Sequence, residues 1–184
     1  MNNIPPEHDT RNIIEAFRGL SVEEIKSRIN RNNFSVGMVN HQYEINIGTM
    51  VRITNAFAGR EFLIIGNKRY DRRSTVGTHN YETVVHIPDA KNLKDWLTAN
   101  NRTMVAIEQD STSIPIHSIE SYPENPVFIF GNENSGIPKD ILEIADIKVC
   151  IPQMGSVRSL NVSSACSIVV YDWCMKHLWA KQTT

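Results

Sequence analysis

Residues 127–138, VFIFGNENSGIP, combine four apolar residues with a glycine-containing loop and a proline placed to begin a helix. A short apolar run bounded by turn residues predicts a buried strand, and proline is favoured in the first turn of a helix. A strand, a loop and a helix in this order are typical of parallel α/β sheets, whose ligands bind at the carboxyl ends of the strands. The loop after residue 130 is therefore a candidate binding site.

Similar runs of β-branched and aromatic residues recur along the chain and alternate with helical patterns. Strands are predicted at residues 34–40, 62–65, 83–87, 103–107, 127–130 and 148–151. Helices are predicted at residues 47–57, 93–100, 139–145 and 162–180. This alternation predicts an α/β domain with a mostly parallel sheet flanked by helices.

A short segment precedes the first predicted strand. Ser21 and Glu24 have the spacing of a capping box, which predicts a helix that begins after Ser21 and continues through Ile29. The segment is too small for a domain of its own. We expect an N-terminal helical extension at residues 1–32, packed on a domain at residues 33–184, with an RNA-contacting arm as the alternative.

The composition is that of an ordinary soluble domain, with 184 residues, 41% hydrophobic and 21% charged. No apolar run approaches the roughly 20 residues that cross a bilayer, and the polar beginning lacks the centre of a secretory signal, so we expect a cytoplasmic protein. The three cysteines and six histidines show no metal-ligand spacing, which predicts reduced thiols and no metal.

Charge is unevenly distributed although the formal net charge is only −1. The overall balance argues against a protein that coats nucleic acid with a uniformly basic surface. The densest basic stretch is Lys68-Arg69-Tyr70-Asp71-Arg72-Arg73, four cations and an aromatic ring in six residues. Lys68, Arg69, Arg72 and Arg73 are candidates for binding RNA phosphates, and a solvated surface loop is an equally weighted alternative.

A second candidate segment, Asn46-Ile47-Gly48-Thr49-Met50-Val51-Arg52, lies between a predicted strand and the following helix. Asn46 is placed to cap that helix, and Gly48 allows another backbone to approach. Arg52 would project from the second turn. On its own this segment also fits a purely structural role.

A third segment, residues 151–165, contains a strand end, a loop and the beginning of the last helix. Ser159 or Asn161 can cap that helix, and exposed amides at a helix N-terminus can hold a polar ligand. A capping role alone is an equally good interpretation of this segment.

In this order and spacing, the three segments resemble the signature motifs of the SpoU/TrmH family of the SPOUT class. Asn46-x-Gly48-x-x-x-Arg52 is similar to the first motif, Gly131-x-Glu133-x-x-Gly136 to the second, and Ile151-Pro152 through Ser159-Leu160-Asn161-Val162-Ser163 to the third. The resemblance covers roughly residues 34–180. Small departures, such as Gln153 after Ile151-Pro152, remove no chemically necessary group.

The resemblance implies a C-terminal trefoil knot, which sequence periodicity cannot reveal. It also implies S-adenosylmethionine as cofactor and methyl transfer to a ribose 2′-hydroxyl in tRNA or rRNA. Backbone groups around Gly131, Ile151 and Leu160 would receive the adenine and ribose of the cofactor, with Ile107 and Glu108 closing one side.

The same resemblance implies the catalytic residues. Arg52 would hold a phosphate and position the 2′-hydroxyl; its role as a base stays open, because arginine normally remains protonated up to about pH 12. Asn46 and Glu133 would orient Arg52 and the loop. Ser159 would contact the phosphate or ribose, and Asn161 would fix the third motif.

The last predicted helix is apolar around most of its circumference, from Val162 to Trp179. A helix of this kind must be buried on most sides, and at the end of a small chain this predicts a partner subunit in a homodimer.

Two other functions fit parts of the sequence. A non-catalytic RNA-binding protein could retain the same fold, but it has no need for Arg52 and Glu133 together. A small-molecule α/β enzyme, such as a nucleotide hydrolase, would need a nucleophile with its base or a metal cluster, and neither is recognisable here.

Overall fold

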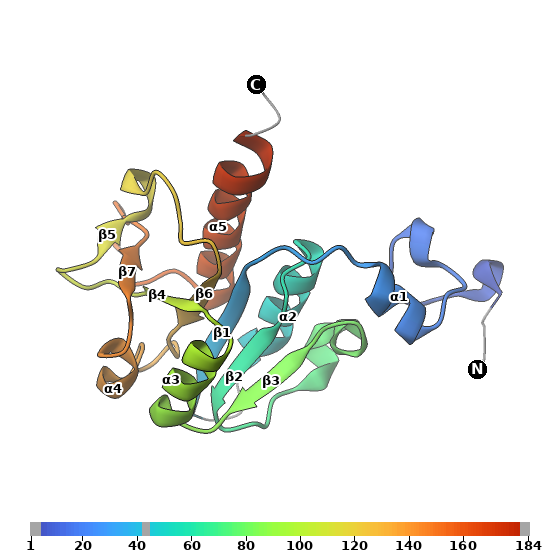
Figure 1. Cartoon of the computed structure of the whole chain (residues 1–184), viewed down its shortest axis with the longest axis horizontal. Helices are drawn as coiled ribbons and strands as arrows, with labels where there is room; N and C mark the ends of the chain where they lie inside the picture. Colours follow the sequence, from blue (N-terminus) through green and yellow to red (C-terminus); the bar gives the residue numbers. More distant parts are fainter. Residues whose placement is uncertain (1–4, 42–44, 181–184) are drawn as a thin grey trace.

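The computed structural model describes residues 5–41 and 45–180. These residues contain a seven-stranded sheet with helices packed around it (Figure 1). All strand pairs are parallel, and the strand order is β3-β2-β1-β6-β4-β7-β5. The strands are β1 (Ser35–Asn40), β2 (Phe62–Gly66), β3 (Val84–Ile87), β4 (Thr103–Ile107), β5 (Ile114–Pro115), β6 (Pro126–Phe130) and β7 (Ile147–Cys150). The mostly parallel sheet predicted from the sequence is confirmed.

Helices cover both faces of the sheet and form two cores. The first core packs α2 (Asn46–Ala56) and α5 (Val162–Cys174) against one face, with Phe34, Met50 and Trp173 among its buried side chains. The second core packs α3 (Ala90–Ala99) and α4 (Lys139–Leu142) against the opposite face, around Leu93 and Ile129. Strands buried on both faces explain why their sequences are continuously apolar instead of alternating.

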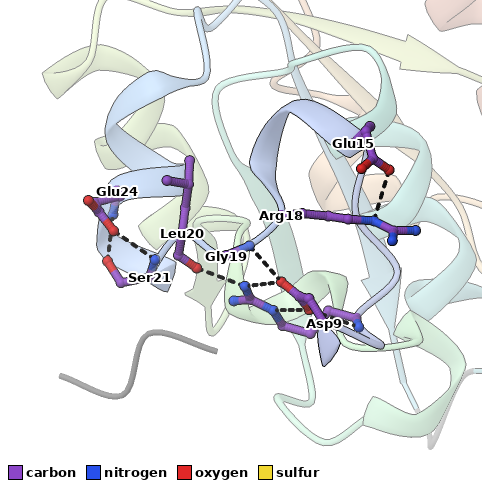
Figure 2. Close-up of polar contacts among 8 residues, drawn as sticks. Asp9, Glu15, Arg18, Gly19, Leu20, Ser21 and Glu24 are labelled. Atoms are coloured by element: carbon purple, nitrogen blue, oxygen red, sulfur yellow. Dashed lines mark hydrogen bonds and ion pairs between the residues drawn. The ribbon is translucent and has the colours of Figure 1, made fainter. Parts of the chain in front are cut away.

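The N-terminal segment contains two 3-10 turns, η1 (Pro6–His8) and η2 (Glu15–Phe17), followed by α1 (Val22–Arg28). Figure 2 shows the predicted capping box, in which Ser21 accepts a hydrogen bond from the Glu24 amide and Glu24 accepts one from the Ser21 amide. The buried carboxylate of Asp9 accepts hydrogen bonds from the Arg11 side chain and the Gly19 amide, and Arg11 holds the pKa of Asp9 well below its usual range.

This segment is fastened to the sheet domain by Arg31. The Arg31 guanidinium donates to the Gly59 and Tyr81 carbonyls and pairs with Glu82, whose side chain is fully buried. Burial raises the pKa of Glu82, and the positive charge of the Arg31 guanidinium partly offsets this by lowering it. An unpaired buried carboxylate would cost folding free energy. Arg31 therefore stabilises the attachment of the N-terminal segment by pairing with Glu82.

Several element boundaries differ from those predicted. α3 begins at Ala90 because Asp89 caps it through the Asn92 amide at 2.8 Å, and α4 ends early at Leu142. The last helix changes at Met175 into a π-helical stretch, Met175–Trp179, instead of continuing as an α-helix to residue 180. The two-residue β5 was not predicted, because a pair of residues carries no periodicity.

The knot, membrane spans, metal sites and cysteines were the remaining subjects of prediction. The trefoil knot stays a prediction. The described residues contain no helix long and apolar enough to cross a membrane, and no cluster of three or more potential metal ligands. The three cysteines are free thiols, and burial raises the pKa of Cys166 and Cys174, so these two are poor nucleophiles.

Candidate active site

The carboxyl ends of four central strands meet at one edge of the sheet. Phe130 at the end of β6 is in register with Met38 of β1 and with Ile107 of β4, and Ile107 is in register with Val149 of β7. The loops that follow β4, β6 and β7 surround a cavity of about 750 Å³. This is the location at which parallel α/β sheets bind their ligands.

The cavity collects most of the residues predicted for the site. All five expected cofactor contacts line it, together with two of the five expected catalytic residues: Ile107, Glu108, Gly131, Ile151, Leu160, Glu133 and Ser159. Asn46, Arg52 and Asn161 do not line it. The expected catalytic residues therefore lie partly on the wall of the cavity and partly outside it.

The second motif forms a tight turn that depends on two glycines. Asn132 and Gly136 exchange backbone hydrogen bonds at 3.1 and 2.8 Å, which closes the loop on itself. A Cβ on Gly131 would lie 2.2 Å from the backbone carbon of Gly136, and Gly136 itself has a φ of +66°. The loop can take this shape only because both positions lack a side chain.

Glu108 holds the far side of this turn. Its carboxylate accepts a hydrogen bond from the Ile137 amide at 3.0 Å and lies directly against Gly136. The neighbouring Gln109 donates through Nε2 to the Ile151 carbonyl at 2.6 Å. The end of β4 thus connects the second motif to the third.

Asn161 joins all three motifs through one side chain. Its Oδ1 caps α5 by accepting from the Ser163 amide at 2.9 Å, which confirms the predicted cap. Its Nδ2 donates to Asn46 Oδ1 at 3.1 Å and to Glu133 Oε1 at 2.7 Å. Residues separated by up to 115 positions are therefore held together by a single amide.

Asn46 does not cap α2, so this prediction is wrong. The helix already includes Asn46, the N-cap position is Ile45, and no side chain caps the helix. The Asn46 side chain instead points its oxygen to Asn161, and the residue is buried. Because the Asn46 side-chain oxygen already accepts a hydrogen bond from Asn161, it is not free to accept one from a backbone amide of α2.

Arg52 lies on the second turn of α2 and is exposed, as predicted. Within the described residues, no hydrogen bond or ion pair connects its guanidinium to Asn46, Glu133 or another group. No direct contact therefore supports the expectation that Asn46 and Glu133 orient Arg52. Both residues instead accept a hydrogen bond from the Asn161 side chain.

The basic stretch forms a second recess of about 640 Å³, lined by Lys68, Arg69, Tyr70, Asp71, Arg72 and Arg73. Burial raises the pKa of the Tyr70 phenol, so the ring stays neutral over the physiological range. The side chain of Asp71 caps the following 3-10 turn through the Arg73 amide at 2.9 Å. These contacts give the stretch a defined shape.

Asn40 at the end of β1 and Gly48 on α2 hold the basic stretch in place. The buried Asn40, at the end of β1, donates to the Arg69 carbonyl at 2.8 Å. A Cβ on Gly48 would lie 1.7 Å from the Ser74 side-chain oxygen, so the close approach predicted at Gly48 is confirmed and its partner is the residue directly after the basic stretch. The basic stretch and the helix that carries Arg52 are therefore packed directly together.

Several polar residues that line the cavity were not predicted, among them Gln109, Asp110, Gln153 and Arg158. Gln109 and Asp110 directly follow the predicted strand at 103–107, and the other two lie in the third motif segment. Position at a strand's carboxyl end was the signal that could have identified Gln109 and Asp110.

Comparisons with known proteins identify the same part of the chain. The model of the SpoU rRNA Methylase family matches residues 33–171. The mouse protein TARBP1, named tRNA (guanosine(18)-2'-O)-methyltransferase, is 26% identical over 140 residues, which cover 72% of this chain and 9% of the mouse protein. The Escherichia coli tRNA (cytidine(34)-2'-O)-methyltransferase is 34% identical over 104 residues, or 55% of this chain and 63% of that protein.

The fold has solved counterparts. The SpoU methyltransferase AviRb from Streptomyces viridochromogenes, solved in complex with the cofactor AdoMet, superposes with a TM-score of 0.72 and 21% identity, over 83% of this chain and 64% of that chain. The chain spans less than two thirds of the length of each of these proteins.

Proposed function

The chain belongs to the SpoU rRNA methylase family, and from this premise we propose that it is an S-adenosylmethionine-dependent methyltransferase acting on a ribose 2′-hydroxyl of tRNA. The observation that carries the proposal is the junction at Asn161, which brings the three motifs together beside the large cavity. The names of the mouse and Escherichia coli relatives support tRNA as the substrate, and rRNA, for which the family model is named, is the alternative.

The cavity fits the proposed cofactor in size and in chemistry. Its volume, about 750 Å³, lies in the range of pockets that bind small molecules. Glu108, Asp110 and Glu133 line it, and carboxylates favour a ligand that carries positive charge. When bound, S-adenosylmethionine supplies an electrophilic methyl group next to its cationic sulfur. Backbone groups around Gly131, Ile151 and Leu160 would hold its adenosine part, with Ile107 and Glu108 on one side.

Arg52 would act on the RNA side of the reaction. Its exposed guanidinium can hold a phosphate with two parallel hydrogen bonds and place a nitrogen near the attacking hydroxyl. Alignment of that hydroxyl with the methyl group is where the protein contributes most to the rate. Ser159 lines the cavity and would contact the same phosphate or ribose.

Transfer of a tritiated methyl group tests the proposal, with total tRNA and total rRNA offered in separate reactions. We expect label in tRNA. Transfer only to rRNA would contradict the substrate that we propose. Binding of RNA without transfer to either pool would contradict the enzymatic function and support a non-catalytic RNA-binding protein.

The basic stretch at residues 68–73 would bind the RNA backbone, because four cations line one recess that packs against the helix carrying Arg52. Arg69→Ala should raise the KM for RNA severalfold and reduce the salt dependence of RNA binding by about one phosphate contact. Affinity for S-adenosylmethionine should not change. Filter binding at several salt concentrations measures this effect.

Lys94→Ala is the matched control, because Lys94 is also exposed but lies on α3, on the opposite face of the sheet. Equal effects of the two substitutions on RNA binding would show that the basic stretch is not a specific RNA-binding site.

We also propose a homodimer formed along α5. One side of this helix is buried in the first core. Ile168 and Tyr171 on α5, with Met175 and Trp179 on the π-helical stretch that continues it, form an exposed apolar stripe, each at least 38% exposed. Such a stripe at the surface is typical of a protein–protein contact. The default arrangement for identical subunits is a twofold axis.

Replacing Ile168 with aspartate should convert the dimer to a monomer, because it buries an unpaired charge in the contact. Light scattering after size exclusion at micromolar concentration measures the mass. Ile14→Asp is the control, since Ile14 is 64% exposed on the N-terminal segment. A monomeric wild-type protein would refute the dimer.

A further inference from the structure

The large cavity is lined by more acidic than basic side chains. Three carboxylates line it, those of Glu108, Asp110 and Glu133. Arg158 is the only lysine or arginine among the described residues that line it. This residue lies in the third motif segment, next to Ser159.

Each carboxylate already has partners within the protein. Glu108 accepts from the Ile137 amide at 3.0 Å, Asp110 accepts from the Thr112 amide at 2.7 Å, and Glu133 accepts from Asn161 at 2.7 Å. Asp110 also pairs with Lys148 at 3.5 Å.

Arg158 is exposed and, within the described part of the chain, its guanidinium forms no hydrogen bond or ion pair, not even with the carboxylates of the same cavity. An arginine that lines a cavity in this state is available to an anionic group of a ligand.

The charges of the methyl donor complement this arrangement. S-adenosylmethionine carries a sulfonium and an ammonium, which are positive, and one carboxylate, which is negative. The carboxylates on the wall favour the two cationic groups, and the donor's own carboxylate then needs a cation. Because the other lining residues are neutral or acidic, Arg158 is the side chain that can supply it.

We propose that Arg158 binds the carboxylate of S-adenosylmethionine and so selects a ligand with an intact amino-acid end; this rests on the function proposed above. The planar guanidinium matches a carboxylate with two parallel hydrogen bonds. The interaction distinguishes the methyl donor from other adenine-containing molecules that lack a carboxylate.

Two ligands that differ only in this carboxylate test the proposal. Isothermal titration in the absence of RNA measures the Kd of S-adenosylmethionine and of decarboxylated S-adenosylmethionine, for the wild-type protein and for Arg158→Gln. We expect the substitution to weaken binding of the intact cofactor about tenfold, the loss of one charge-assisted pair of hydrogen bonds. Binding of the decarboxylated ligand should change less than twofold, which also shows that the cavity is correctly folded.

Arg60→Gln provides the matched control, because Arg60 is exposed and lies just before the amino end of β2, at the opposite edge of the sheet. It removes the same charge and should leave both affinities unchanged. Equal weakening of both ligands by Arg158→Gln, or of neither, would overturn the proposal, as would an effect confined to RNA binding. Absence of cofactor binding by the wild-type protein would instead refute the proposed function.

Discussion

Replacing Arg52 with alanine is expected to lower the rate of methyl transfer about a thousandfold, within the range that removal of one catalytic side chain produces. The physical reason is that, in the function proposed above, the exposed guanidinium on α2 would hold the RNA phosphate and polarise the 2′-hydroxyl. Arg52 does not line the large cavity, so the Kd of S-adenosylmethionine should stay within twofold of the wild-type value. Single-turnover transfer to tRNA and calorimetric cofactor binding measure the two quantities.

Two variants sharpen this prediction. Arg52→Lys keeps the charge but loses the planar fork, so it should recover only a small part of the rate. Arg60→Ala removes an exposed arginine four residues after the end of the same helix and should leave the rate unchanged. Near-normal turnover by Arg52→Ala would show that Arg52 is not a catalytic residue.

Replacing Gly131 with alanine is expected to weaken cofactor binding roughly a hundredfold, because overpacking a closed turn costs up to about 3 kcal/mol. The new Cβ would lie 2.2 Å from the Gly136 backbone carbon and 2.5 Å from the Ile137 nitrogen. The turn would have to open, which breaks the hydrogen bonds between Asn132 and Gly136 and displaces the wall of the cavity. Calorimetric titration with S-adenosylmethionine measures the loss.

Gly155→Ala is the control for this change. No atom lies within 4 Å of a Cβ built at Gly155, so the same substitution in the third motif segment should alter the cofactor Kd less than twofold. If Gly131→Ala binds the cofactor as tightly as the wild type does, the turn is not the wall of the cofactor site.

The sheet was predictable from the sequence because its strands are buried on both faces. Phe128 and Ile129 belong to different cores, and each of the two needs an apolar side chain, so the strand is a continuous apolar run. The same strands end at the residues that carry the motifs. The five expected cofactor contacts followed from the resemblance of these motifs to the SpoU/TrmH family, and all five line the cavity.

Long-range contacts were beyond sequence reasoning. Asn46 has the residue type and position of a helix cap, but Asn161 occupies its side-chain oxygen. Local propensity cannot reveal a partner 115 residues away. Arg158 was missed for a related reason, because a charged residue in a polar loop resembles a solvated surface until the cavity beside it is known.

We propose, above all, that the protein transfers a methyl group to a ribose hydroxyl of tRNA. Mass spectrometry of nucleosides tests it most directly, using tRNA incubated with the protein and S-adenosylmethionine that carries a deuterated methyl group. We expect a labelled 2′-O-methylnucleoside with the wild-type protein and about a thousandfold less with Arg52→Ala. A label on a base, or no labelled nucleoside while the cofactor binds, would contradict the proposed function.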